Sequence, residues 1–468
     1  MTSNKTKIIA TIGPACATLP KLNKMVKAGV NAFRVNMSHG KQEDKERLLR
    51  LIKQVKLKEG ERPCIIVDLS GPKIRVKDVE PDFKIKKGQK IFISSRGKPK
   101  SDTVVISQGI QFTKIENGAG IKINDGRIHV KVEKKLSSTK LQCTTVLGGR
   151  IEKSKGVNFP GVMLNLPALT DQDKKDLQMA IREEADWIAL SFVRTADDKA
   201  EIDAQLQKAK AKIPIIAKIE KWEALQNLDA IIKKFDAVMV ARGDLGVETP
   251  PEQVPLAQKK IIKQANLFGK PVIIATQMLE SMIKEPVPTR AEVSDIANAI
   301  FDGADALMVT GETASGNYPI EVIDVLSTVV IETEKTIDFE TIPRPIGGIN
   351  TANAISHATQ QAAHDLSVAC IITMTYSGST ALMISRYRPN VPVVALTPIV
   401  ETCRKLSIVW GISPFKINEY QSVDDVPNIA EKILKKKKLI KPDSRYIITG
   451  GVPVGVPGTT NYLSIQKV

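Results

Sequence analysis

Hydrophobic residues form eight short, uninterrupted runs in the first two-thirds of the chain, with helix-like patterns between them. Continuous runs, as opposed to alternating ones, are typical of strands that are buried on both faces. Later runs follow each other at roughly the length of one βα unit, so the pattern predicts a (β/α)₈ TIM barrel. The predicted strands are Lys7–Pro14, Ala32–Ser38, Cys64–Pro72, Trp187–Val193, Ile213–Glu220, Ala237–Asp244, Pro271–Met278 and Ala306–Thr313.

Helix boundaries can be predicted at two places. The segment Leu19–Ala28 precedes Gly29, a residue that favours the end of a helix. Thr289 and Glu292 have the spacing of a capping box, which predicts a helix running toward Gly303.

Two regions have a different pattern. Residues 76–155 show short alternating segments separated by Asn-Gly and Asp-Gly turns, which predicts a small β-barrel inserted at the barrel mouth, where it could act as a lid. After a linker at Thr341–Gly348, helix and strand patterns predict a separate α/β domain. We expect the barrel in 1–71 and 158–341, the lid in 72–157 and the C-terminal domain in 342–468.

Composition narrows the class of protein. The chain has 468 residues, 42% apolar and 25% charged, which is typical of globular domains. No run approaches the ~18 apolar residues of a membrane helix, and the N-terminus lacks an apolar signal core, so we expect a cytoplasmic protein without a membrane partner. Its five cysteines are scattered without a CxxC pair, which argues against a zinc site or a disulfide framework.

The formal net charge of +17 has two interpretations. It could indicate nucleic-acid binding, or a lysine-rich surface around a site for anionic substrates. Aromatic residues make up only 4% of the chain, and no RNA-binding signature with stacking aromatics occurs, so we favour the second interpretation and expect no nucleic-acid partner.

Polar residues at the ends of the later strands carry the candidate chemistry, because the C-terminal strand ends of a barrel meet at one mouth. Glu220 and Asp244 are oxygen ligands suited to magnesium, although helix N-capping is an alternative role. Lys218 lies two residues before Glu220 and therefore on the same side of the strand, where an ammonium could neutralise a phosphoryl group in transfer. Thr276 and Thr310 could bind an acid group or relay a proton, or could be caps.

The earlier strands end in groups suited to anions and cations. Arg34 could bind phosphate in two-point fashion, and Asn36 and Ser38 offer oxygen ligands. His39 follows them; Lys73 and Arg75 lie beyond Asp68-Leu69 at the start of the insert, and Lys155 lies at its end. No phosphate-binding GxxxxGK[ST] loop and no protein-kinase motif occurs, so any ATP chemistry needs another architecture.

Seven blocks along the chain resemble the pyruvate kinase family in order and spacing, and together they cover the barrel. They are Arg34–Gly40, Gly71–Arg75, Lys218–Glu220, Met239–Val247, Ala275–Met282, Pro288–Glu292 and Gly311–Pro319. The resemblance implies phosphoryl transfer from phosphoenolpyruvate to ADP, giving pyruvate and ATP, the final step of glycolysis.

The resemblance also implies roles for individual residues. Glu220 and Asp244 would hold Mg²⁺ or Mn²⁺, and Lys218 would stabilise the phosphoryl group in transit. Arg34 would contact phosphate, while the N–H groups of Gly243 and Asp244, with Thr276, would hold the substrate carboxylate. A proton would reach enolpyruvate through Thr276 or through water near Thr310. The positions that match nucleotide contacts are Asn36, His39, Arg75 and Lys155.

One departure from the family concerns a monovalent cation. Family members commonly bind potassium near Asn36, Ser38, Asp68 and the carbonyl of Leu69, and have glutamate where this chain has Lys73. A tethered ammonium could take the place of that ion, so we expect Lys73 to fill this pocket and potassium not to be required. The other departure is Thr310, where the family commonly has serine.

The C-terminal domain contains a candidate effector site. Ser377, Gly378, Ser379 and Thr380 lie between a predicted strand and helix, where backbone N–H groups and hydroxyls can bind phosphate. An ordinary helix cap is the alternative. The resemblance implies a phosphorylated allosteric effector at this position and a homotetramer.

Two competing functions remain open at this point. A metal-dependent barrel lyase acting on oxo acids or phosphoenolpyruvate would use the same carboxylate pair, but would need neither the nucleotide nor the lid residues. A basic nucleic-acid-binding protein would show binding that weakens steeply with salt.

Overall fold

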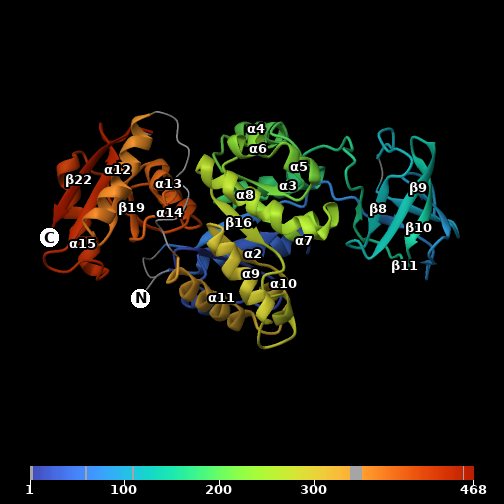
Figure 1. Cartoon of the computed structure of the whole chain (residues 1–468), viewed down its shortest axis with the longest axis horizontal. Coiled ribbons are helices and arrows are strands. Elements are labelled where there is room, and N and C mark those ends of the chain that lie inside the picture. The colour runs from blue at the N-terminus through green and yellow to red at the C-terminus, as the bar shows by residue number, and fades with distance from the viewer. Residues whose placement is uncertain (1–3, 58–60, 108–109, 338–349, 457) are drawn as a thin grey trace.

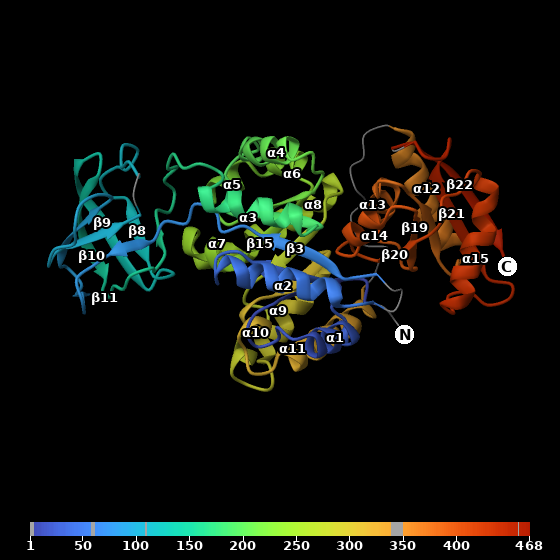
Figure 2. The same cartoon turned by 180° about the vertical axis from the view of Figure 1, so that it is seen from behind.

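The computed structural model describes residues 4–57, 61–107, 110–337, 350–456 and 458–468, in three parts that lie in a row (Figure 1). The barrel is in the middle, the inserted β domain lies at one end, and the C-terminal domain lies at the other. Seen from behind, α2 and α3 cover the barrel between the two outer parts (Figure 2). The predicted linker Thr341–Gly348 lies outside the described residues.

The central part is a closed parallel barrel in the strand order β1-β17-β16-β15-β14-β13-β3-β2, so the predicted barrel is confirmed. All eight predicted strands are present, although each is shorter than its apolar run because the polar residues at its end turn out of the sheet. The strands are β1 (Lys7–Thr11), β2 (Ala32–Asn36), β3 (Cys64–Asp68), β13 (Trp187–Leu190), β14 (Ile215–Ile219), β15 (Ala237–Ala241), β16 (Val272–Ala275) and β17 (Ala306–Val309).

Helices surround the barrel strands and bury one apolar stripe each against them. The two predicted helix signals are confirmed, since α1 ends before Gly29 and Thr289 forms a capping box with Glu292. The helices are α1 (Leu19–Ala28), α2 (Gln42–Gln54), α3 (Asp171–Arg182), α4 (Asp198–Lys208), α5 (Trp222–Gln226), α6 (Leu228–Lys234), α7 (Arg242–Glu248), α8 (Val254–Phe268), α9 (Arg290–Phe301), α10 (Gly311–Ala314) and α11 (Pro319–Glu334), with 3₁₀ turns at Pro251–Gln253 and Glu280–Ile283.

The inserted domain contains a seven-stranded sheet in the order β12-β8-β9-β10-β6-β7-β4 and a two-stranded sheet of β11 and β5. Its core is separate from that of the barrel and includes the fully buried Phe112 and Phe159. The strands are β4 (Val76–Asp78), β5 (Lys84–Ile85), β6 (Lys90–Ser94), β7 (Thr103–Ile106), β8 (Gly120–Ile123), β9 (Ile128–Ser137), β10 (Lys140–Leu147), β11 (Gly149–Arg150) and β12 (Val157–Asn158).

The C-terminal part is a five-stranded sheet in the order β20-β19-β18-β21-β22 with helices against it, which confirms the predicted α/β domain. Only β22 is antiparallel to its neighbour. The elements are α12 (Thr351–Asp365), β18 (Ile371–Met374), α13 (Ser379–Ser385), β19 (Val393–Thr397), α14 (Val400–Leu406), β20 (Ile412–Lys416), a 3₁₀ turn (Val423–Asp425), α15 (Val426–Lys436), β21 (Arg445–Gly451) and β22 (Thr460–Lys467).

The C-terminal domain closes the end of the barrel that is opposite the strand C-termini. Ile408, from the segment after α14, is fully buried in one apolar cluster with Ile9, Trp187 and Met239 of the barrel. Asp305, just before β17, accepts a hydrogen bond from the backbone of Trp410 and pairs with Arg388 at 3.2 Å. The mouth formed by the strand C-termini is therefore left to the inserted domain. None of the described helices combines the length and apolar character that a membrane span needs.

Candidate active site

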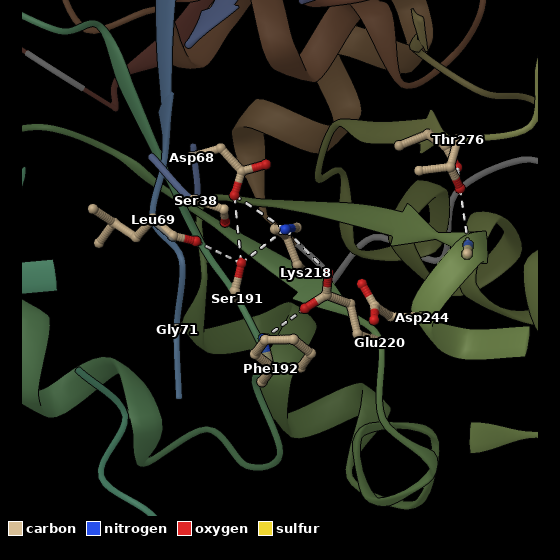
Figure 3. Close-up of polar contacts among 12 residues, drawn as sticks. Ser38, Asp68, Leu69, Gly71, Ser191, Phe192, Lys218, Glu220, Asp244 and Thr276 are labelled. Atoms are coloured by element: carbon tan, nitrogen blue, oxygen red, sulfur yellow. Dashed lines mark hydrogen bonds and ion pairs between the residues drawn. The ribbon is translucent and has the colours of Figure 1, made fainter. Parts of the chain in front are cut away.

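Lys218 lies at the centre of a buried polar network at the barrel mouth (Figure 3). Its ammonium is 3.0 Å from Asp68 Oδ1 and 3.0 Å from Glu220 Oε1, and it donates to Ser191 Oγ at 2.7 Å. These partners come from the ends of β3, β14 and β13, which are neighbours in the barrel. The closed sheet thus brings together groups that are far apart in the sequence, as the strand-end argument predicts.

The charges in this network shift each other's pKa values. Burial favours the neutral amine of Lys218, but the charges of Asp68 and Glu220 outweigh it and raise its pKa above the ordinary value. Burial alone would likewise raise the pKa of Asp68, yet the Lys218 and Arg34 cations lower it. Glu220 has the opposite outcome, because burial and the charge of Asp244 together raise its pKa. The network holds Lys218 as a cation.

Glu220 and Asp244 turn their carboxyl groups toward one another beside Lys218 (Figure 3). Glu220 is 1% exposed, and its Oε2 accepts a hydrogen bond from the backbone of Phe192 at 2.7 Å, which fixes its orientation. Asp244, in the first turn of α7, is partly exposed. Two hard oxygen donors at an open mouth fit Mg²⁺ or Mn²⁺, which commonly takes one or two carboxylates and fills its other positions with water and substrate oxygens. Among the described residues no set of three or more acidic, histidine or cysteine side chains forms a denser metal site.

Arg34 reaches the same network from β2. Its Nε and Nη2 atoms lie 2.8 and 2.7 Å from Asp68 Oδ2, and its Nη1 donates to Thr11 Oγ1 at 3.2 Å. The two-point contact holds the guanidinium plane in place beside Lys218. Asp68 therefore holds two cations, Arg34 and Lys218, side by side at the barrel mouth.

Thr276 occupies a strained position at the end of β16. Its φ is +69° and that of Gln277 is +55°, a region that β-branched residues rarely adopt. The turn is held by Arg242, whose guanidinium donates to the carbonyls of Thr276 and Gln277 and pairs with Asp295 at 2.5 Å.

This turn points the Thr276 hydroxyl at the start of α7. Its Oγ1 accepts a hydrogen bond from the N–H of Gly243 at 2.9 Å, so the hydroxyl and the first N–H groups of the helix lie together. The N-terminus of a helix favours negative charge. The predicted carboxylate-binding groups Gly243, Asp244 and Thr276 are thus adjacent in space.

Thr310 directly follows β17 and lies against Glu312. Its N–H donates to Glu312 Oε2 at 2.7 Å, and its hydroxyl donates to the same oxygen at 3.3 Å. Thr310, Gly243, Asp244 and Thr276 line one cavity of about 860 Å³, which also receives Arg127 from the inserted domain. The cavity is large enough for a small acid and lies between the barrel mouth and the insert.

The predicted nucleotide contacts partly converge. Partial burial, and then the charges of the nearby Arg75, Arg34 and Lys73, lower the pKa of His39 below its ordinary value. Asn36 Oδ1 accepts a hydrogen bond from the N–H of Ser38, which forms a turn at the end of β2. At the insert boundary, Arg75 donates to the carbonyl of Ser154, beside the exposed Lys155. The geometry offers a cationic edge to this side of the mouth.

Lys73 pairs with Asp244 and, in the described residues, its ammonium makes no hydrogen bond or ion pair to the pocket predicted for it. Its ammonium is 2.7 Å from Asp244 Oδ1 and 5.8 Å from the centre of the Phe192 ring, and no hydrogen bond or ion pair joins it to Asn36, Ser38 or Asp68 in the described residues. The chain turns at Gly71-Pro72, and the side chain then meets the carboxylate of Asp244.

Other groups use the pocket oxygens. Asp68 pairs with Arg34 and Lys218, and the Leu69 carbonyl accepts a hydrogen bond from Ser191 at 2.7 Å.

Sequence reasoning missed Ser191 and Phe192. Both lie inside the predicted strand Trp187–Val193 and directly follow the observed β13, so their position near the strand end was a signal that could have identified them.

The candidate effector loop before α13 is largely occupied by internal hydrogen bonds. The Gly378 N–H donates to Thr375 Oγ1, and the buried Thr380 hydroxyl lies 2.8 Å from the Thr460 hydroxyl. The exposed Ser377 donates a hydrogen bond to the hydroxyl of the half-buried Ser379 at 3.1 Å. The N-cap residue of α13 is Gly378, which has no side chain to cap the first turn.

Comparison with known proteins gives concordant results. The family description "Pyruvate kinase, barrel domain" matches residues 3–323, and "Pyruvate kinase, alpha/beta domain" matches residues 353–466. A pyruvate kinase of Clostridium acetobutylicum is 41% identical over 99% of both chains. One from Geobacillus stearothermophilus is 41% identical over 99% of this chain and 80% of its own.

A solved structure has the same fold. The crystal structure of a pyruvate kinase from Cryptosporidium parvum superposes with a TM-score of 0.91 and 33% identity, covering 100% of this chain and 96% of that one.

Proposed function

This chain belongs to the pyruvate kinase family of phosphotransferases, and from that premise we propose that it transfers the phosphoryl group of phosphoenolpyruvate to ADP, giving pyruvate and ATP. The family in general needs a divalent metal. We assign that metal, Mg²⁺ or Mn²⁺, to Glu220 and Asp244, since the two carboxylates lie side by side at the barrel mouth. A metal held there would supply positive charge to the phosphoryl oxygens and the substrate acid.

Lys218 and Arg34 carry the transfer step in this proposal. The phosphoryl group passes between oxygens while its charge is spread over its remaining oxygens, and fixed cations stabilise that charge. Asp68 and Ser191 hold the Lys218 ammonium, and Asp68 also holds the Arg34 guanidinium, so little reorganisation is needed when the charge moves. On the other side of the mouth, Asn36, His39, Arg75 and Lys155 would contact the nucleotide.

The acid end of the substrate would lie at the start of α7. The N–H groups of Gly243 and Asp244 and the Thr276 hydroxyl are grouped there, and a helix start favours a carboxylate. The transfer leaves enolpyruvate, whose terminal carbon takes a proton. Thr276, or water ordered near Thr310, would deliver it. The inserted domain would act as a lid over both ends of the substrate.

The single observation that carries this proposal is the Lys218 ammonium, which lies 3.0 Å from Glu220 beside the Asp244 carboxylate. The test is detection of pyruvate from phosphoenolpyruvate, ADP and Mg²⁺ with the purified chain. We expect turnover by the native protein and a loss of about a hundredfold or more in kcat for Lys218→Met. Turnover without ADP, or none at all in the native protein, would refute the proposal.

We also propose that the reaction needs no added potassium. The pocket oxygens of Asp68 and Leu69 are already bonded to protein donors, and Lys73 adds a further positive charge close by. Activity should be the same in tetramethylammonium and potassium salts, and Lys73→Glu should become potassium-stimulated. Native activity that rises only with potassium would contradict this.

The remaining features are extended from the family. We propose a role in the last step of glycolysis in the cytoplasm, a homotetramer, and regulation by a phosphorylated effector at Ser377–Thr380. Light scattering measures the assembly. Activity against phosphoenolpyruvate concentration, with and without sugar phosphates or AMP, tests the effector; an unchanged curve with all of them would reject it.

A further inference from the structure

Helix α7 holds the inserted domain at both of its connections to the barrel. On the outgoing connection, between β3 and β4, Lys73 pairs with Asp244 at 2.7 Å. On the returning connection, Asn158 in β12 donates to Glu248 Oε1 at 2.7 Å. Between them in sequence, Lys122 of β8 donates to the carbonyl of Val247 at 2.7 Å. Three contacts from the insert and its edges therefore converge on one short helix.

These three contacts differ in what else they can bind. The Asn158–Glu248 bond is buried, and Lys221 also bonds the same oxygen of Glu248. The Lys122 contact uses a backbone carbonyl. Only the Lys73 contact uses a carboxylate of the proposed metal site, and both of its side chains are about a quarter exposed, 25% for Lys73 and 26% for Asp244. It is thus the contact that a divalent cation can compete for.

We propose that Lys73 competes directly with the divalent ion for Asp244, so that binding of the ion releases the outgoing connection of the lid from α7. This rests on the proposed function, because it takes Glu220 and Asp244 as the metal ligands. The Lys73 ammonium, 2.7 Å from Asp244 Oδ1, occupies one of the two oxygens that this carboxylate offers to a cation. The Asn158 and Lys122 contacts are unaffected by the ion, so they keep the insert in register while the Lys73 side chain moves.

The charge balance supports exchange. Asp244 and Glu220 form a pair of neighbouring carboxylates, and the Lys218 ammonium serves Glu220 while that of Lys73 serves Asp244. A divalent ion between the two carboxylates carries two positive charges, whereas Lys73 brings only one. Lys73 then has the Phe192 ring, 5.8 Å away, as a remaining favourable contact.

The experiment measures Mn²⁺ binding to the full chain without substrates, by electron paramagnetic resonance of the free ion. We compare the native protein with Lys73→Met. The control is Lys77→Met, because Lys77 is an exposed lysine in β4 and its replacement removes the same charge from the insert. Removing the competitor should tighten Mn²⁺ binding by about threefold to tenfold, as expected for a partly exposed ion pair, while the control changes it by less than about twofold.

A second measurement follows the connection itself. Hydrogen exchange of residues 71–76 should rise when Mn²⁺ is added to the native protein and should already be high in Lys73→Met. Circular dichroism establishes that each variant is folded. Equal Mn²⁺ affinity of the native and Lys73→Met proteins would overturn the inference and leave the metal site in place. If the native protein binds no Mn²⁺, the proposed metal ligands are wrong and the inference fails with them.

Discussion

Replacing Asp68 by asparagine tests the buried charge network directly. The carboxylate is fully buried and receives the Arg34 guanidinium at 2.7 and 2.8 Å and the Lys218 ammonium at 3.0 Å. Asparagine has nearly the same shape but no charge, so two cations would share a neutral amide. The loss of one partner from a buried ion pair costs about 3–5 kcal/mol, and the lower figure applies because the amide oxygen still accepts one hydrogen bond.

About 3 kcal/mol corresponds to a fall of about 6 °C or more in the melting temperature for a unit of this size. Catalysis should fall further, because the Lys218 and Arg34 groups lose their common anchor; a displacement of about 1 Å can lower kcat about a hundredfold. Scanning calorimetry and the coupled pyruvate assay measure the two effects.

The matched control is Asp176→Asn. Asp176 is also fully buried and pairs with Lys45 at 3.2 Å, but it lies between α2 and α3, outside the barrel mouth. It should lower the melting temperature and leave kcat unchanged. If Asp68→Asn and Asp176→Asn affect kcat equally, the network around Lys218 has no catalytic role.

The dependence on pH provides a further check on the same variant. The cations hold the pKa of Asp68 below its ordinary value in the folded chain. A carboxyl group whose pKa is lowered by folding stabilises the protein at pH values above its pKa in the unfolded chain, about 3.9. This stabilisation is lost as the pH falls through the pKa in the folded chain. The stability difference between the native protein and Asp68→Asn should therefore be constant near neutral pH and shrink only below about pH 4.

Three further predictions concern neighbouring groups. Arg242→Lys should raise the KM for phosphoenolpyruvate about tenfold with a smaller change in kcat, because lysine lacks the planar fork with which Arg242 bonds Asp295 and both carbonyls of the Thr276 turn together; an unchanged KM speaks against this. Ser191→Ala should lower kcat about tenfold and Ser191→Thr should restore part of it, since a hydroxyl orients Lys218; equal rates would contradict this. Burial lowers the pKa of Lys7 to about 8, so native stability relative to Lys7→Met should rise by up to about 1.4 kcal/mol per pH unit between that value and about 10.4; a flat difference in urea unfolding refutes it.

The barrel and its site residues could be predicted from sequence because parallel strands impose their own geometry. A strand buried on both faces is a continuous apolar run, and the residue at its end must lie at the mouth whatever its rotamer. Lys218, Glu220 and Asp244 follow from that rule alone, and the structure brings them together.

Contacts that depend on side-chain direction could not be predicted in this way. Nothing in the local sequence around Lys73 indicates that its ammonium pairs with Asp244, 171 positions later, and not with Asp68, which is nearer in sequence. The positive φ of Thr276 is equally hidden, because a β-branched residue normally avoids it and the turn is stabilised by hydrogen bonds from the distant Arg242 and Gly243.

The placement of Ile408 in the floor of the barrel has a consequence for synthesis. The ribosome synthesises all eight barrel strands before it reaches Ile408, which closes the end of the barrel opposite the active site. A nascent chain that does not yet include Ile408 exposes the apolar residues around Trp187 and Met239 to chaperones and to other incomplete chains. We therefore expect the barrel to complete its folding late, after the part of the C-terminal domain that contains Ile408 has been synthesised.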